Sequence, residues 1–334
     1  MRSKLLLFLF FLLAVCNAEI EWNFTFPIGT GPTAELQVGT PPVPVRVYAY
    51  LDPIYSFMTD LEIPNASIHG KYSPSQSSSF VQTDVLIDWT GMPAGLNGEQ
   101  KTSKSFAVRN DSLYAAIAPF GTLGFGHSPA DGQAPSFVEG LLTDYADQVV
   151  SFSYENIPAA ADHPGEVGLL LRLGDRQAAR CSADWLELEE AKFEIDLGDW
   201  GFEIDEFSMG AYTWALGGQA SVQLTSNVLT LPSTVFSRVV RVLGGHEAEG
   251  EGEKTTVSCD SAEDLVFSIA GRDFRLLPAD YVDQTTQSAD NQCEFKAEAI
   301  ACTECFLLPV GILRDRCFLF DYARPGVAFA DRLS

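Results

Sequence analysis

Basic residues are scarce in this chain. Its 334 residues include 21 Lys and Arg against 45 Asp and Glu, which gives a formal net charge of −24. A surface of this sign repels a phosphate backbone, and no local cluster of Lys and Arg offsets the repulsion. We therefore exclude nucleic acid as a partner and expect the negative charge to keep the protein soluble.

Long apolar runs are absent after the first residues. Arg2 and Lys4 precede an uninterrupted apolar run from Leu5 to Val15, and small residues that suit cleavage follow it. This run of 11 residues is too short for a hydrocarbon core, which needs about 20. Residues 1–18 therefore predict a secretory signal peptide. We expect a mature protein without a membrane anchor, either extracellular or in the lumen of an acidic secretory compartment.

Patterns for several catalytic chemistries are missing as well. The sequence has no Gly-x-Ser-x-Gly nucleophile elbow, no His-Glu-x-x-His zinc motif and no calcium-loop pattern. The few histidines are scattered, so each is expected to be a surface or packed residue: His69, His127, His163 and His246. We predict neither a metal nor a cofactor.

Cysteines are few, and after residue 18 they are even in number. In a secreted chain this predicts three disulfides, although the sequence alone does not choose the pairing. The pair Cys302-Thr-Glu-Cys305 is also open to interpretation as a redox or zinc dithiol. Because no second such pair and no nearby His stands at ligand spacing, structural bridging is favoured. The six residues are Cys181, Cys259, Cys293, Cys302, Cys305 and Cys317.

Three segments match the acceptor pattern for N-linked glycans, in which Asn is followed two residues later by Ser or Thr. A signal peptide would send the chain through the compartment that uses this pattern. We expect a glycoprotein with at least one of these sites occupied: Asn23, Asn65 and Asn110.

Short alternating runs dominate the rest of the sequence. Segments such as 43–50 and 148–154 alternate apolar and polar residues between Gly, Pro, Asn and Asp turns, which predicts a mostly antiparallel β protein. Helical spacing is seen in 232–243, with Ser233 as the expected cap, and in 135–142. The acidic stretch 244–254 predicts a solvated loop.

Two segments in different halves of the chain resemble a pair of active-site loops. The first runs from Ala34 to Pro42 and continues in Val47–Ser56, and the second is Gly218–Pro232. Together they resemble the Asp-Thr-Gly loops of the pepsin-like aspartic peptidases. Further similarities follow in the same order and cover nearly all of the mature chain: the Ser-rich 72–80, the apolar 119–126, and the closing segments 306–314, 317–321 and 326–330.

The resemblance implies a fold and a division of the chain. It predicts an all-β protein, mostly antiparallel with few short helices, in which two lobes flank a central cleft. Because 165–175 resembles the strand that crosses between lobes, we place the N-terminal β lobe at 19–175 and the C-terminal β lobe at 176–334. The resemblance also implies a bridge between Cys259 and Cys293, and it leaves the pairing of the other four cysteines open.

The chemistry of this family depends on two carboxyls that hold one water and share one proton. Two carboxylates this close cannot both ionise, so one serves as the base and the other as the acid. Asp52 matches the first of these residues, whereas Gln223 stands at the second position. An amide neither takes up nor releases a proton in the accessible pH range, so Gln223 can orient a water but cannot replace the acid. We expect Asp52 to be catalytically silent and to act as a turn former.

The residues beside these two positions also differ from the resembled pattern. Pro53 and Ile54 stand where Thr and Gly follow the first Asp, and Leu224 and Thr225 stand after the second position. Ile54 adds a branched side chain where Gly lets the backbone approach the carboxyls, and Pro53 removes a backbone donor. With Pro53 and Leu224 in place of two Thr residues, the cross-lobe hydrogen bonds implied by the resemblance cannot form.

Other positions near the resembled cleft are changed too. Phe120 stands in place of an Asp, and Pro309-Val310 replaces a Gly-Asp pair. Trp89 falls near the Tyr at the tip of the family's flap. It is expected either to close over a ligand or, as is commoner for a lone Trp, to pack in the core or at its rim.

These observations predict a secreted, monomeric, catalytically inactive aspartic-peptidase homologue that binds peptides or proteins in its cleft. One alternative is a weakly active acid endopeptidase, in which Asp52 works with another carboxyl or with a water held by Gln223. A second alternative is an inhibitor or decoy protein that binds its partner by its surface.

Overall fold

A computed structural model of the chain describes its strands and most of its second half. The described residues are 21–26, 33–38, 43–50, 57–59, 82–83, 96–101, 104–109, 121–126, 137–143, 145–156, 167–191, 200–214, 217–224, 226–248, 250 and 253–333. The predicted signal peptide at 1–18 lies outside these ranges.

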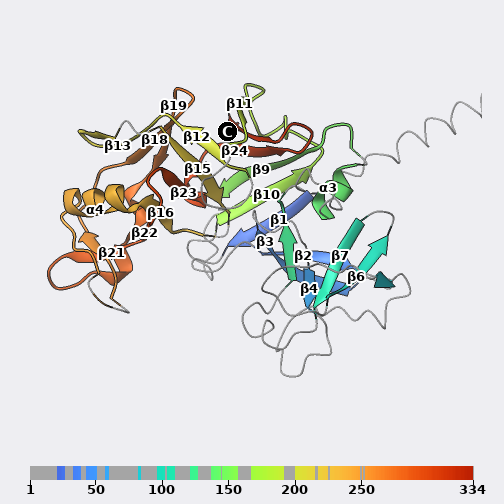
Figure 1. Ribbon diagram of the computed structural model, residues 1–334, viewed down its shortest axis with the longest axis horizontal. Helices are drawn as coiled ribbons and strands as arrows, with labels where there is room; N and C mark the ends of the chain where they lie inside the picture. The colour runs from blue at the N-terminus through green and yellow to red at the C-terminus, as the bar shows by residue number, and fades with distance from the viewer. Residues whose placement is uncertain are drawn as a thin grey trace, which may run out of the picture.

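The fold is mostly β with antiparallel sheets and few helices, as predicted (Figure 1). The largest sheet has the order β11-β25-β24-β9-β10-β1-β2-β3-β8-β4-β7-β6-β5. Its strands are β1 (Glu21–Phe26), β2 (Thr33–Val38), β3 (Val43–Tyr50), β4 (Phe57–Thr59), β5 (Gln82–Thr83), β6 (Leu96–Lys101), β7 (Lys104–Arg109), β8 (Gly121–Gly124), β9 (Val149–Asn156), β10 (Val167–Leu173), β11 (Leu186–Glu189), β24 (Arg316–Asp321) and β25 (Gly326–Asp331).

The second half of the chain builds three smaller sheets. The five-stranded sheet has β12 (Phe202–Ile204), β15 (Gly218–Gln223), β23 (Cys305–Pro309), β16 (Leu229–Pro232) and β22 (Ala297–Ile300), in that order. The four-stranded sheet has β14 (Tyr212–Trp214), β13 (Glu206–Met209), β18 (Leu265–Ile269) and β19 (Arg272–Leu276). The three-stranded sheet has β17 (Thr256–Ser258), β21 (Gln292–Phe295) and β20 (Val282–Asp283).

Short helices lie between strands in the described ranges. They are α3 (Phe137–Leu142), α4 (Ser233–Val242), α5 (Pro278–Tyr281), η2 (Gln284–Thr286) and η3 (Val310–Leu313). Both predicted helices are present as α3 and α4, and both are shorter than predicted. The predicted cap on α4 is wrong: Pro232 is the N-cap residue, and the Ser233 hydroxyl donates to the Ile300 carbonyl at 2.8 Å. None of the helices in the described ranges is long and apolar enough to cross a membrane.

A single sheet joins the two ends of the chain. An apolar row crosses it through Leu171, Phe152, Phe318, Phe329 and Leu186, which lie opposite one another on β10, β9, β24, β25 and β11. The residues alternate in direction along each strand, so this row faces the core while its neighbours face away. The predicted division at residue 175 therefore separates segments that one sheet connects, and the two-lobe boundary stays a prediction.

The other face of β9 carries buried serines. Ser151 and Ser153 are fully buried there, and Ser151 contacts the segment that follows β10. The Gln177 side-chain amide donates to the Ser151 hydroxyl at 2.9 Å, and the Ser151 hydroxyl donates to the Asp175 carbonyl at 2.6 Å. Because buried polar groups are costly unless they are hydrogen-bonded, these contacts fix the segment onto the sheet.

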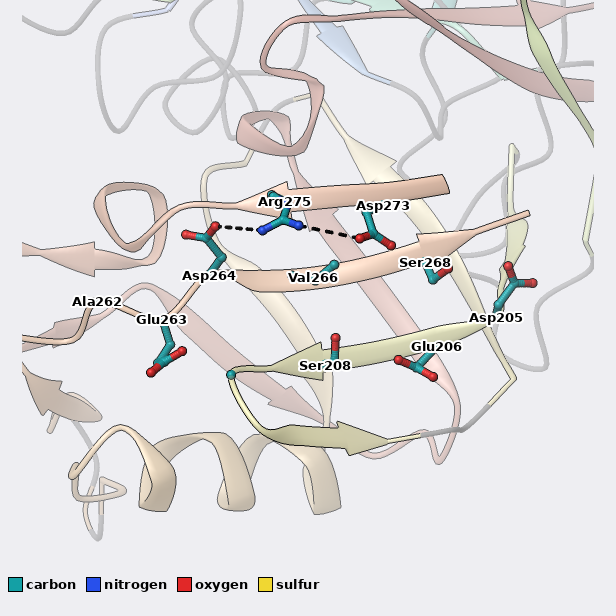
Figure 2. Close-up of a pocket in the computed structure, with 11 residues that line it drawn as sticks. Asp205, Glu206, Ser208, Ala262, Glu263, Asp264, Val266, Ser268, Asp273 and Arg275 are labelled. Carbon is teal, nitrogen blue, oxygen red and sulfur yellow. Dashed lines mark hydrogen bonds and ion pairs between the residues drawn. The ribbon is translucent and has the colours of Figure 1, made fainter. Parts of the chain in front are cut away.

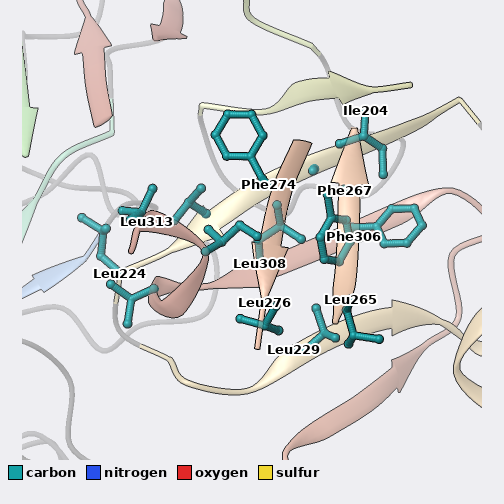
Figure 3. Packing of buried hydrophobic residues seen from close by; sticks show 14 of the residues in the cluster. Ile204, Leu224, Leu229, Leu265, Phe267, Phe274, Leu276, Phe306, Leu308 and Leu313 are labelled. Atoms are coloured by element: carbon teal, nitrogen blue, oxygen red, sulfur yellow. The ribbon is translucent and has the colours of Figure 1, made fainter. Parts of the chain in front are cut away.

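The hydrophobic core of the second half lies between the five-stranded and four-stranded sheets and helix α4. Figure 3 shows Phe267 and Phe306, whose ring centroids are 6.0 Å apart, next to the aliphatic side chains of the same cluster. Val222 and Leu308 are fully buried on neighbouring strands. Helix α4 contributes apolar residues at helical spacing: Val235, Phe236, Val239 and Val240.

Three disulfides join the six cysteines. The implied bridge between Cys259 and Cys293 is confirmed. The other two are Cys181–Cys317, which ties the segment after β10 to β24, and Cys302–Cys305, which closes the turn between β22 and β23. Their sequence separations are 136, 34 and 3 for Cys181–Cys317, Cys259–Cys293 and Cys302–Cys305. The structure thus gives Cys302 and Cys305 the structural bridge that the sequence favoured.

We predict that the disulfides stabilise the protein in the order of their loop lengths. The loop-closure relation gives about 5, about 4 and about 2 kcal/mol for the separations of 136, 34 and 3. The measurement is urea unfolding, without reductant, of three double Cys→Ala variants, one for each bridge. A larger loss for the Cys302–Cys305 variant than for the Cys181–Cys317 variant would contradict this account.

We also predict a large cost for truncating the core at Leu308. Leu308→Ala removes buried methyl groups and leaves a cavity, so the free energy of unfolding should fall by about 2–5 kcal/mol. Leu333→Ala is the matched control, because Leu333 is 48 % exposed, and it should change stability by about 0.5 kcal/mol or less. Equal losses in the two variants would mean that this core does not determine stability.

Candidate functional site

The predicted second loop starts at the end of β15. This strand runs parallel to β23, with Val222 opposite Leu308 and Gln223 opposite Pro309. Val222 and Leu308 are fully buried, so the strand pair is anchored in the core up to the last residue before the loop. Gln223 itself is half-buried. Its side chain therefore stands at the border between the packed sheet and solvent.

The two halves of the chain repeat the same strand arrangement around their predicted loops. In the first, β3 is parallel to β8, β8 is antiparallel to β4, and β4 is parallel to β7. In the second, β15 is parallel to β23, β23 is antiparallel to β16, and β16 is parallel to β22. The internal duplication, which is faint in the sequence, is thus clear in the strand pairing. The segments between the corresponding strands are 51–56, which lies outside the described residues, and 224–228.

The strand registers repeat as well. Thr122 on β8 pairs with Tyr48 and Phe57, which are nine residues apart, and Leu307 on β23 pairs with Ser221 and Thr230, which are also nine residues apart. If Tyr48 is matched with Ser221 by these pairings, residue 52 corresponds to residue 225. The motif resemblance instead matches residue 52 with residue 223, two residues earlier. The assignment of Gln223 as the partner of Asp52 therefore stays a prediction.

Neither the motif match nor the match from strand pairing places a carboxyl opposite Asp52. The stretch from residue 207 to residue 246 has no Asp and no Glu. It contains β15, β16 and the loop between them. Both candidate positions, 223 and 225, lie in this stretch, where the sequence has Gln and Thr, and neither side chain titrates as a carboxylic acid.

Two hydrogen bonds accepted by Ser226, one within the loop and one from Val310, hold the loop after Gln223. The Ser226 hydroxyl accepts a hydrogen bond from the Val228 amide at 3.0 Å, and the Ser226 carbonyl accepts one from the Val310 amide at 3.3 Å. Val310, at a position where the resemblance implies an Asp, is buried in the core together with Pro309. Sequence reasoning missed Ser226, although a Ser two residues before Val228 is a recognisable turn signal.

Leu224, the residue after Gln223, points its side chain into the core. It is fully buried and belongs to the same core cluster as Leu308, Val310 and Leu313 (Figure 3). A buried leucine offers no donor or acceptor to a neighbouring loop. The loop is therefore held by the apolar packing of Leu224 together with the hydrogen bonds of Ser226.

The remaining predicted site residues are not placed by the structure. Asp52, Pro53, Ile54, Trp89 and Thr225 lie outside the described residues.

Of the three predicted glycosylation sites, one lies on a described strand. Asn23 is in β1, opposite Leu170 of β10. Asn65 and Asn110 lie outside the described ranges. The use of these sites stays a prediction.

A separate hollow of about 600 Å³ lies on the outer face of the four-stranded sheet (Figure 2). Its floor carries Ser208, Val266 and Ser268, and Arg275 pairs there with Asp264 at 3.4 Å and with Asp273 at 3.7 Å. Further carboxylates of the lining have no cationic partner within the described part of the chain, so the hollow repels anions. Across the described residues, no group of His, Cys, Asp and Glu side chains could hold a metal ion.

Comparison with known proteins identifies the family. A model of the eukaryotic aspartyl protease family matches residues 122–332. The chain is 27 % identical to gastricsin of Cavia porcellus, over 89 % of this chain and 79 % of that protein. It is 26 % identical to pepsin A of Sus scrofa, over 79 % and 71 %, and 23 % identical to vacuolar protease A of Neurospora crassa, over 81 % and 72 %.

The family match includes both strands that hold the second loop, β15 and β23, as well as β8 of the first half. It extends over more than half of the chain, and the strand pairing around the two loops has the internal repeat that the resemblance implied. The chain therefore belongs to the eukaryotic aspartyl protease family.

Proposed function

We propose that this protein is a catalytically inactive member of its family that binds peptides or protein segments in its cleft. One observation carries the proposal: no carboxyl is available in the second half of the catalytic site. Gln223 stands at the motif position, and the acid-free stretch from 207 to 246 leaves no Asp or Glu to take its place.

Without a second carboxyl, peptide hydrolysis lacks its acid, whereas the strands around the loop are unaffected. Hydrolysis by this family needs one group that accepts a proton from water and one that donates a proton to the substrate. An amide at Gln223 does neither. A general acid or base contributes about 10²–10⁴ in rate, and the members of one catalytic unit are not lost additively. Asp52 alone is therefore expected to give no ordinary turnover.

The loop packing supports the same proposal. A Leu224 side chain that is fully buried cannot form the cross-lobe hydrogen bond implied for a Thr at this position. The loop is instead fixed by the hydrogen bond from the Val310 amide to the Ser226 carbonyl. Such a loop keeps its shape without the polar network on which the catalytic geometry depends.

A binding role is supported by the peptide binding of the family and by the strands that this chain retains beside the predicted cleft. Members of the family bind peptide substrates in the cleft. Here β15, β16 and β23 keep the strand arrangement that frames one side of it. Extended peptides bind such surfaces through main-chain hydrogen bonds, which need no catalytic residue. We therefore propose a peptide or protein segment as the ligand.

The proposed location is the secretory pathway or the extracellular space. The three disulfides form and persist in oxidising compartments. The apolar run at 5–15 suits a signal peptide, which would send the chain there.

The first test is a peptidase assay with a broad set of quenched fluorescent peptides between pH 2 and pH 7. We predict that the purified wild-type protein cleaves none of them faster than Asp52→Ala does. A pepsin run in parallel shows that the peptides are cleavable. Cleavage that is lost both in Asp52→Ala and on addition of a transition-state mimic would instead support the weakly active endopeptidase.

The second test asks whether a ligand lies in the cleft. Peptides selected on the wild-type protein should bind at least about tenfold more weakly to Gln223→Trp, because the larger ring occupies space at the border of the cleft. Glu304→Gln, an exposed change on the turn before β23, is the control and should bind as the wild type does. Binding that is unchanged in folded Gln223→Trp would favour the alternative of an inhibitor or decoy that uses its surface.

A further inference from the structure

The three disulfides differ in how accessible they are to a reagent in solution. Cys302 is 9 % exposed and Cys259 is 6 % exposed, whereas Cys181 is 1 % exposed and Cys293 and Cys317 are fully buried. The residues around Cys302 are exposed as well, because the bridge closes the turn from β22 to β23 at the surface of the molecule. A thiolate can therefore approach the Cys302 sulfur more easily than the sulfurs of the Cys181–Cys317 bridge.

The Cys302–Cys305 bridge also closes the shortest loop of the three disulfides. It joins residues with a sequence separation of 3, compared with 34 and 136 for the other two. A short loop restricts the unfolded chain least, so the folded state depends least on this bond.

Other contacts hold the turn in place when the bond is open. The Glu304 carbonyl accepts a hydrogen bond from the Gln219 amide at 2.8 Å, and Cys305 pairs with Gln219 in the parallel register of β15 and β23. The next residue, Phe306, is fully buried in the core. Strand β23 thus begins at the same place whether the sulfurs are joined or free.

We propose that Cys302–Cys305 is a thiol–disulfide exchange site, open to a dithiol while the rest of the protein stays folded. The attacking thiolate forms a bond to the Cys302 sulfur, the Cys302–Cys305 bond breaks, and Cys305 leaves as a thiolate that takes a proton from water. The second thiol of the reagent then attacks the mixed disulfide and releases Cys302. The reagent is oxidised to a disulfide by two electrons, and the protein gains two thiols. This inference does not depend on the proposed binding role.

The charge around the turn sets the rate of this exchange. Glu304 directly precedes Cys305, and a neighbouring carboxylate repels an incoming thiolate. This repulsion slows the reaction. Replacing Glu304 with Gln should therefore speed the opening of this bond by about two- to fivefold, with no change at the other two.

The experiment is a timed reduction of the intact wild-type protein with dithiothreitol, followed by alkylation with iodoacetamide and peptide mapping. Cys302 and Cys305 should become labelled at least about tenfold faster than the four other bridged cysteines. The near-ultraviolet circular dichroism should persist through this first phase. Loss of all three bonds in one phase, together with that signal, would overturn the proposal, as would labelling of Cys302 and Cys305 last.

Two single variants test which sulfur is attacked. Cys305→Ala leaves Cys302 as a free thiol near the surface, and it should form a mixed disulfide with oxidised glutathione. Cys302→Ala leaves Cys305, which is 2 % exposed, and its adduct should form at least about tenfold more slowly. Equal rates in the two folded variants would contradict the assigned direction of attack. The double Cys→Ala variant, which should keep its circular dichroism, shows that the turn folds without the bond.

Discussion

The parallel pairing of β15 with β23 is the constraint on which the second half of the molecule depends. Strand β23 is the middle strand of its sheet and contacts β15 on one side and β16 on the other. Val222 and Leu308 fill the core from these strands, and Gln223 then emerges opposite Pro309 where the sheet ends. The loop that would carry catalysis thus extends directly from a buried strand pair. A change of side chain there alters the chemistry without removing the support.

This arrangement explains how the loop is held without an ionisable group. The loop after β15 is closed by the Ser226 carbonyl and the Val310 amide, and its Leu224 packs inward. These contacts do not involve an ionisable group. Packing and backbone hydrogen bonds are independent of protonation, so the loop is held without the acid that the reaction needs. Stability and chemistry are separable here because they use different atoms.

The sequence predicted local and motif-level features better than long-range ones. The alternating runs predicted the strands, and the apolar spacing predicted α4, but the Ser233 cap was wrong because its hydroxyl bonds to a carbonyl 67 residues away. Family resemblance identified Cys259–Cys293, whereas the bridge from Cys181 to Cys317 depends on strand order that no local pattern records. The inward packing of Leu224 likewise follows from the tertiary fold, whereas the turn at Ser226 has a local signal that the sequence reasoning missed.

The route of the chain through its largest sheet has a consequence for synthesis. Strand β24 pairs with β9, and β25 pairs with β24 and β11, so strands from late in the chain complete the sheet that also contains β1. Until those last strands leave the ribosome, β9 presents an open edge with unpaired backbone groups. Contacts between residues so far apart in the chain also form slowly. The nascent chain is therefore open to aggregation at this edge from the time β9 is made until β24 can pair with it.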